Sequence, residues 1–145
     1  MTALKSVKWQ LLIMTGLGTY IFLIAITIPY MWYYSQFSDT GHDMPYYTER
    51  ANQMVPALIL CLGPFVFYIA SRWLCGRVGQ AFYLHGILLF LTQEVIDLML
   101  TAFSGHLMEF LTQPELYIVY STKLLGALAG SYFASKAHKL VMQPQ

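Results

Sequence analysis

Residues 90 to 100 read FLTQEVIDLML and place two acidic side chains, Glu94 and Asp97, inside an otherwise apolar segment. A basic residue, Lys123, interrupts a second apolar segment further along the chain. Charges are tolerated in hydrocarbon where they neutralise one another, and such residues often mark proton or ion pathways. The chemistry that these residue types offer is therefore ion pairing and the binding of protons or substrates.

The elements that must position these charges are transmembrane helices. Of the 145 residues, 57% are hydrophobic and only 10% are charged, which is outside the range of soluble domains. Roughly 20 apolar residues in a helix cross the ~30 Å of hydrocarbon in a bilayer. We predict a single domain, residues 1–145. It is an all-α, polytopic membrane protein with four transmembrane helices forming a bundle, and the spans lie at about 10–34, 54–74, 80–103 and 115–135.

Basic residues near the ends of these spans are distributed asymmetrically. Six lie on one side of the membrane, and Arg50 alone lies on the other: Lys5, Lys8, Arg72, Arg77, Lys136 and Lys139. Acidic residues follow the opposite distribution, and Asp39, Asp43, Glu49, Glu109 and Glu115 share the side of Arg50. Because loops rich in Lys and Arg stay on the cytoplasmic side, we predict a multi-pass protein with both termini cytoplasmic.

The polar residues of the third and fourth spans are expected to face each other. At 100° per residue, one face of the third span carries Gln93, Glu94, Asp97 and Thr101. Counted from the outer ends of their spans, Glu94 and Lys123 both lie about 12 to 14 Å deep. We therefore predict an intramembrane polar site in which Glu94 is the main partner of Lys123.

Small residues follow Lys123 on the same face of the fourth span. The sequence GALAG gives the Gly-x-x-x-Gly spacing, which lets helix backbones approach closely. We predict a helix contact, within the bundle or between subunits, made by Gly126, Ala127, Gly130 and Ala134. In the second span, Gly63 and Pro64 predict a kink, because proline removes a backbone hydrogen bond there.

Motifs of enzymes and cofactor sites are missing from the sequence. It contains no His-Glu-x-x-His, no nucleophile elbow and no Gly-rich phosphate loop. His85 is the only histidine inside a predicted span, whereas a haem bundle needs paired histidines. The segment DTGHD at 39 to 43 is typical of a solvated turn rather than a metal site. We therefore predict no catalytic residues, no metal, no cofactor and no nucleic-acid partner.

Three classes of function fit these features. An accessory or structural subunit, or an oligomer-forming bundle, needs only a packing face and the buried acid–base contact between the third and fourth spans. A small proton-coupled transporter or channel would use Glu94 and Asp97. A membrane-embedded enzyme would need a lateral pocket for a lipid substrate. The sequence favours the first two classes, with the lipid bilayer and further copies or other membrane subunits as partners.

Overall fold

The computed structural model describes residues 7–103, 105, 108 and 111–142, and over these residues the regular structure is entirely helical. Its elements in chain order are α1 (Trp9–Tyr33), the short π-helix η2 (Tyr34–Ser38), α2 (Met44–Val78), α3 (Phe82–Phe103) and α5 (Pro114–Met142). The all-helical prediction is therefore confirmed. Lys5 and Glu109, which contribute to the predicted orientation, lie outside the described residues.

Three of the helices are long and apolar enough to cross a membrane. These are α1 with its continuation η2, α2 and α3. The 29-residue α5 is long enough, but it contains no stretch as apolar as those of the other three helices, and Lys123 interrupts its middle. The three apolar helices indicate a membrane-embedded protein.

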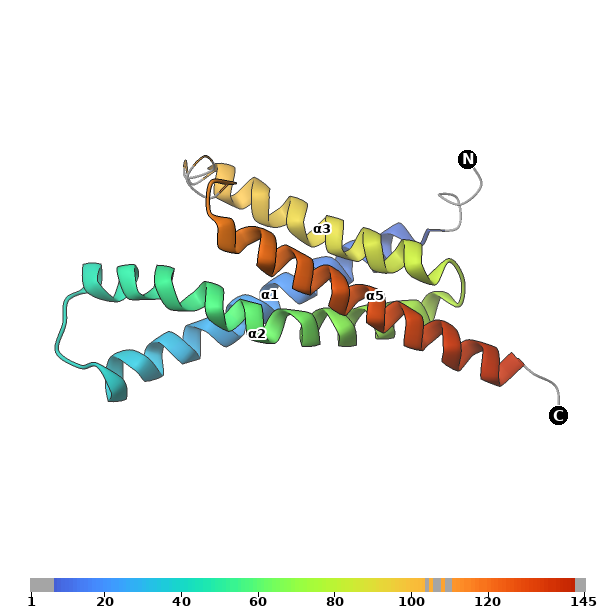
Figure 1. The fold of residues 1–145 in the computed structure, drawn as a ribbon, viewed down its shortest axis with the longest axis horizontal. Coiled ribbons are helices and arrows are strands. Elements are labelled where there is room, and N and C mark those ends of the chain that lie inside the picture. The colour runs from blue at the N-terminus through green and yellow to red at the C-terminus, as the bar shows by residue number, and fades with distance from the viewer. Residues whose placement is uncertain (1–6, 104, 106–107, 109–110, 143–145) are drawn as a thin grey trace.

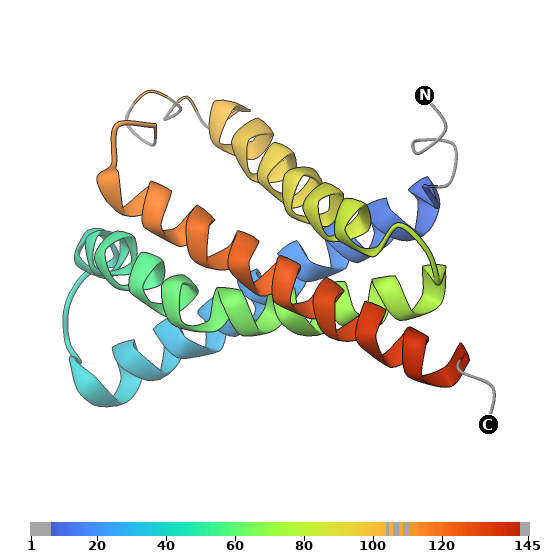
Figure 2. The same cartoon turned by 45° about the vertical axis from the view of Figure 1, so that its right-hand side comes forward.

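The helices run alternately along one axis (Figure 1). The start of α1, the turn between α2 and α3 and the end of α5 lie at one end of the molecule, and η2 and the starts of α2 and α5 lie at the other (Figures 1 and 2). The most extensive helix contact joins α2 to α5, while α3 packs against both α5 and α1. This topology brings α3 and α5 together as antiparallel neighbours.

Helix α2 begins ten residues before the predicted second span. The Asp43 side chain accepts a hydrogen bond from the Tyr46 N–H at 3.3 Å, and Pro45 lies in the first turn. Both features stabilise a helix start at this point. At the other end, Gly79 adopts φ 74° and donates its N–H to the Cys75 carbonyl oxygen at 3.0 Å. A helix of 35 residues is about 52 Å long, so α2 exceeds the thickness of the hydrocarbon.

The small residues of α5 pack against α2 of the same chain. A Cβ added at Gly126 would clash with the Pro64 carbonyl oxygen, and one added at Gly130 would clash with the Tyr68 carbonyl oxygen. Ala127 and Ala134 are buried beside them. The Gly-x-x-x-Gly face is thus used inside the bundle. Helix α2 remains one continuous helix through Pro64, and the predicted kink at Gly63 and Pro64 stays a prediction.

Candidate intramembrane polar site

The Lys123 ammonium and the Glu94 carboxylate meet between α5 and α3. Lys123 Nζ lies 3.0 Å from Glu94 Oε1, and the two side chains are only 4% and 6% exposed. The same ammonium donates a longer hydrogen bond of 3.5 Å to Gln93 Oε1. Both acceptors come from consecutive residues of α3, so one face of this helix holds the lysine head group.

Aromatic rings and a glycine complete the surroundings of Lys123. Its Nζ lies 5.4 Å from the centroid of the Tyr120 ring and 5.9 Å from that of Phe67, both within reach of a cation–π interaction. A Cβ added at Gly63 would lie 3.2 Å from Lys123 Cγ. Helix α2 therefore contributes the Phe67 ring near the charge and, at Gly63, the space for the aliphatic part of the lysine.

The second oxygen of Glu94 is not used by the ion pair. Glu94 Oε2 and the Tyr120 hydroxyl are both buried, and neither makes a hydrogen bond of standard geometry. The two groups still interact electrostatically. Buried polar atoms nearly always have a partner. Tyr120 and Glu94 are close enough for a hydrogen bond to each other, so a small rearrangement of the hydroxyl and the carboxylate would satisfy both.

Asp97 lies one turn from Glu94 and borders a small cavity. The cavity has a volume of about 190 Å³ and is lined by residues of all four long helices: Tyr20, Leu23, Ile24, Thr27, Val55, Ile59, Gln93, Asp97 and Lys123. Asp97 interacts electrostatically with Lys123 and with Tyr20. Within the described residues, however, only Glu94 lies within 4.0 Å of the Lys123 ammonium as an ion-pair partner. The two acids thus have different environments.

The remaining predicted member, Thr101, is held by the backbone. Its hydroxyl donates to the carbonyl oxygen of Asp97 at 2.9 Å. The structure therefore brings Glu94, Gln93 and Lys123 into direct contact. Asp97 lines the same cavity as Gln93 and Lys123. Thr101 lies one turn further along α3. Their role in function remains a prediction.

Sequence reasoning missed the contributions of the first two helices to this site. Tyr20 and Thr27 of α1 line the cavity, and Phe67 of α2 lies near the lysine. Tyr20 and Thr27 are seven residues apart and so share a helix face, which is a signal that could have been used. No comparable signal identifies Phe67, because apolar aromatic residues occur throughout these helices.

A second buried polar cluster joins α2 and α5 nearer the opposite end of the bundle. The Ser71 hydroxyl lies 2.7 Å from the Ala127 carbonyl oxygen and 2.9 Å from the Ser131 hydroxyl. Cys75 Sγ donates to the Phe82 carbonyl oxygen at 3.2 Å. These groups form hydrogen bonds to one another and to the backbone. Gly86 of α3 packs directly against them, since a Cβ there would clash with the Ser131 hydroxyl. We assign this cluster to helix packing.

A third polar cluster surrounds Asp39, between η2 and α2. Its carboxylate accepts hydrogen bonds from the hydroxyls of Tyr46 and Tyr34, the latter at 3.1 Å, and lies 3.0 Å from His42 Nε2. The Tyr46 hydrogen bond is the main reason why the pKa of Asp39 lies below its usual value. In the part of the chain that the structure describes, no three His, Cys, Asp or Glu side chains are grouped to hold a metal ion.

Among these clusters, the Lys123 site is the one that combines opposite charges, burial and an adjoining cavity. Such an arrangement can hold a proton or a small cation, because a second carboxylate lies close to a pair that is already neutral. Comparison with protein-family models, curated proteins and solved structures gave no match.

Proposed function

We propose that this chain is a four-span membrane protein that binds a proton or small cation at Asp97, and that it acts as a small proton-coupled transporter or channel. The cavity between Asp97 and Lys123 is the observation that carries this proposal. A cavity of about 190 Å³ with both polar and apolar walls has room for several water molecules. A carboxylate beside water in a membrane helix is a typical site for reversible proton binding.

The proposal of a fourth span and of cytoplasmic termini has its own support. Helix α5 has 29 residues, more than the roughly 20 that a span needs. Its central charge, Lys123, is neutralised by Glu94, which lowers the penalty for placing it in hydrocarbon. Lys8 precedes the start of α1, and Arg72 and Arg77 lie in the last part of α2. These two helix ends lie opposite to η2 (Figure 1), as the positive-inside rule requires for a cytoplasmic end.

Charge balance distinguishes the two carboxylates. Glu94 and Lys123 form a neutral pair, so Asp97 is the acid whose charge is left for a proton or another cation. Asp97 also lies nearer than Glu94 to the C-terminal end of α3, which is at the same end of the molecule as η2. We therefore expect ions to reach Asp97 from that end, while Glu94 holds Lys123 in place.

Proton flux into liposomes tests the proposal. Purified protein is reconstituted with a pH-sensitive dye inside the vesicles, and a potassium gradient with valinomycin drives proton entry. The wild type is expected to acidify the lumen faster than empty liposomes, and Asp97→Asn is expected to abolish the difference. The matched control is Asp39→Asn, which removes a half-buried carboxylate outside the cavity and should leave the flux unchanged. Equal flux in the wild type, Asp97→Asn and empty liposomes contradicts the proposal.

An accessory or structural subunit is the second candidate, and a groove between α1 and α2 favours it. This groove of about 430 Å³ has mainly apolar walls that include Phe22, Val66 and Ile69. Gly18 lies in it, and a Cβ added there would meet no atom within 4 Å. A helix of another subunit could pack there. If so, Gly18→Leu should shift the oligomer distribution in native mass spectrometry, and an unchanged distribution counts against this candidate.

A further inference from the structure

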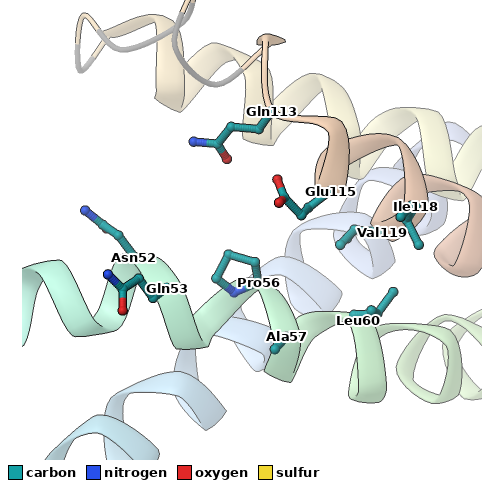
Figure 3. A pocket seen from close by; sticks show the side chains of 9 residues that line it. All are labelled: Asn52, Gln53, Pro56, Ala57, Leu60, Gln113, Glu115, Ile118 and Val119. Carbon is teal, nitrogen blue, oxygen red and sulfur yellow. The ribbon is translucent and has the colours of Figure 1, made fainter.

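A second groove, distinct from the proton site, opens between α2 and α5 beside the end that carries η2 (Figure 3). Its volume is about 510 Å³. The side chains of Asn52 and Gln53 border it on α2, and those of Gln113 and Glu115 border it at the start of α5. In Figure 3 the Glu115 carboxylate of α5 and the amide of Gln113, just before α5, point into the space between α5 and the start of α2.

The groove changes from polar to apolar along its length. The four polar side chains lie at its outer part, and residues such as Leu60 and Val119 form the part that runs toward the middle of the helices. Along α2 the same change occurs in the sequence, where the polar stretch ending at Gln53 gives way to an apolar run. A site of this kind at a membrane boundary fits an amphiphile, with its head group at the polar end and a chain along the apolar wall.

The charges at the groove select the head group. Among the described residues, Glu115 is the only formally charged one in the lining of the groove, and it has no hydrogen-bond or ion-pair partner there. On the α2 side, Arg50 Nη1 donates to Gln53 Oε1 at 3.2 Å, which places a guanidinium at the edge of the groove. A negative group on α5 and a positive group on α2 complement a head group that carries both an ammonium and a phosphate.

We propose that this groove binds a phospholipid with a primary ammonium, such as phosphatidylethanolamine. The ammonium contacts Glu115, the phosphate lies toward Arg50 and the amide of Asn52, and an acyl chain covers Leu60. A primary ammonium has three N–H donors for the carboxylate and the amide oxygens, whereas a choline head group has none. The site should therefore distinguish these two head groups although both are zwitterionic.

Native mass spectrometry of the full-length protein with matched lipids tests this inference. Phosphatidylethanolamine, phosphatidylcholine and phosphatidylglycerol with identical acyl chains are added to the protein in detergent. The wild type is expected to retain phosphatidylethanolamine about tenfold better than phosphatidylcholine, because one hydrogen bond to a charged group changes affinity by about that factor. Glu115→Gln should remove this preference, and Glu49→Gln, a carboxylate of α2 outside the groove, should keep it.

Two further arms make the outcome unambiguous. Ile118 is exposed and lines the groove, so Ile118→Trp should fill it and reduce retention of phosphatidylethanolamine several-fold without changing any charge. Soluble glycerophosphoethanolamine should not compete at lipid concentrations, because it lacks the acyl chains. Four results would each overturn the proposal: equal retention of the two zwitterionic lipids by the wild type, a preference that survives in Glu115→Gln, unchanged retention of phosphatidylethanolamine by Ile118→Trp, or competition by the soluble head group.

Discussion

Glu94 lies between packed helices and Asp39 lies in the connection from η2 to α2, and the two carboxylates are held in different ways. Glu94 has one charged partner within 4.0 Å, and its second oxygen lacks a standard hydrogen bond. Asp39 has the Tyr34 and Tyr46 hydroxyls and the His42 ring. The Glu94 side chain is 6% exposed and the Asp39 side chain 29%. Because a charge depends on its partner more strongly the more deeply it is buried, we expect the first region to be more sensitive to single changes than the second.

The largest effect is expected from Lys123→Met, which leaves Glu94 buried without its cation. Breaking a buried ion pair at one partner destabilises a protein by about 3–5 kcal/mol. The double variant Lys123→Met with Glu94→Gln should recover much of this loss, because no unpaired charge remains. The measurement is a double-mutant cycle of unfolding free energies in detergent. Additive losses would show that the two groups do not stabilise each other.

The same cycle separates structure from function when the proton-flux assay is added. If the double variant regains stability but transports no protons, the charges are needed for function. If it regains both, the Glu94 and Lys123 pair serves only to join α3 to α5.

A smaller loss of stability is expected from Gly126→Ala, three residues beyond Lys123 in α5. The added Cβ would lie 2.8 Å from Pro64 Cα, so the backbones of α2 and α5 must separate. Overpacking of this kind costs about 1–3 kcal/mol. Gly76→Ala is the matched control, because a Cβ there meets no atom within 4 Å. If the two variants were equally stable to heat, α2 and α5 would have to lie further apart at Gly126 than they do in the structure.

Around Asp39 the expected effect is smaller still. Asp39→Asn keeps the shape of the side chain and leaves the hydroxyls of Tyr34 and Tyr46 at the surface, where water replaces the lost interactions. We expect Asp39→Asn to lower the Tm by much less than Lys123→Met does under the same conditions. A decrease of similar size in both variants would remove the contrast between the two regions.

The smallest effect concerns pH. The pKa of Asp39 is lowered in the folded protein, so its contribution to stability is present above the unfolded-state pKa of about 3.9 and is lost as the pH falls through the lower folded value. Wild type and Asp39→Asn should therefore differ in Tm at neutral pH. This difference should shrink as the pH falls below about 4 and should vanish below the folded-state pKa of Asp39. Tyr46→Phe removes the main cause of the shift and should reduce the difference. A gap that persists in acid contradicts this assignment.

The sequence predicted the charged pair better than its surroundings. Helical periodicity and matched depth indicate that Glu94 and Lys123 face each other, because both arguments need only residue spacing. The contributions of Tyr20 and Phe67 depend on which faces of α1 and α2 turn inward, and near-continuous apolar sequence does not determine this. The apolar run predicts only the part of α2 from residue 54 onward. The first ten residues of the helix follow the N-cap Asp43 and are mostly polar, so hydropathy does not indicate them.

The same limit applies to the glycine face of α5. Gly-x-x-x-Gly spacing indicates close packing but does not name the partner helix. In the structure the partner is α2 of the same chain, through Pro64 and Tyr68. The spacing of residues in one sequence could not choose between this contact and one with a second copy.

With α5 as the fourth span, as proposed above, the ion pair has a consequence for how the protein enters the membrane. Glu94 and Lys123 are separated by 29 positions in the chain, so α3 is synthesised before its cation exists. Released into lipid alone, α3 would carry two acids without a partner, and α5 would carry an unpaired lysine. Neither helix should therefore leave the insertion machinery for the bilayer until both have been made. Biogenesis of this protein would then proceed by the joint release of a helical hairpin, and a ribosome that stalls before α5 would leave a product that cells recognise as misinserted.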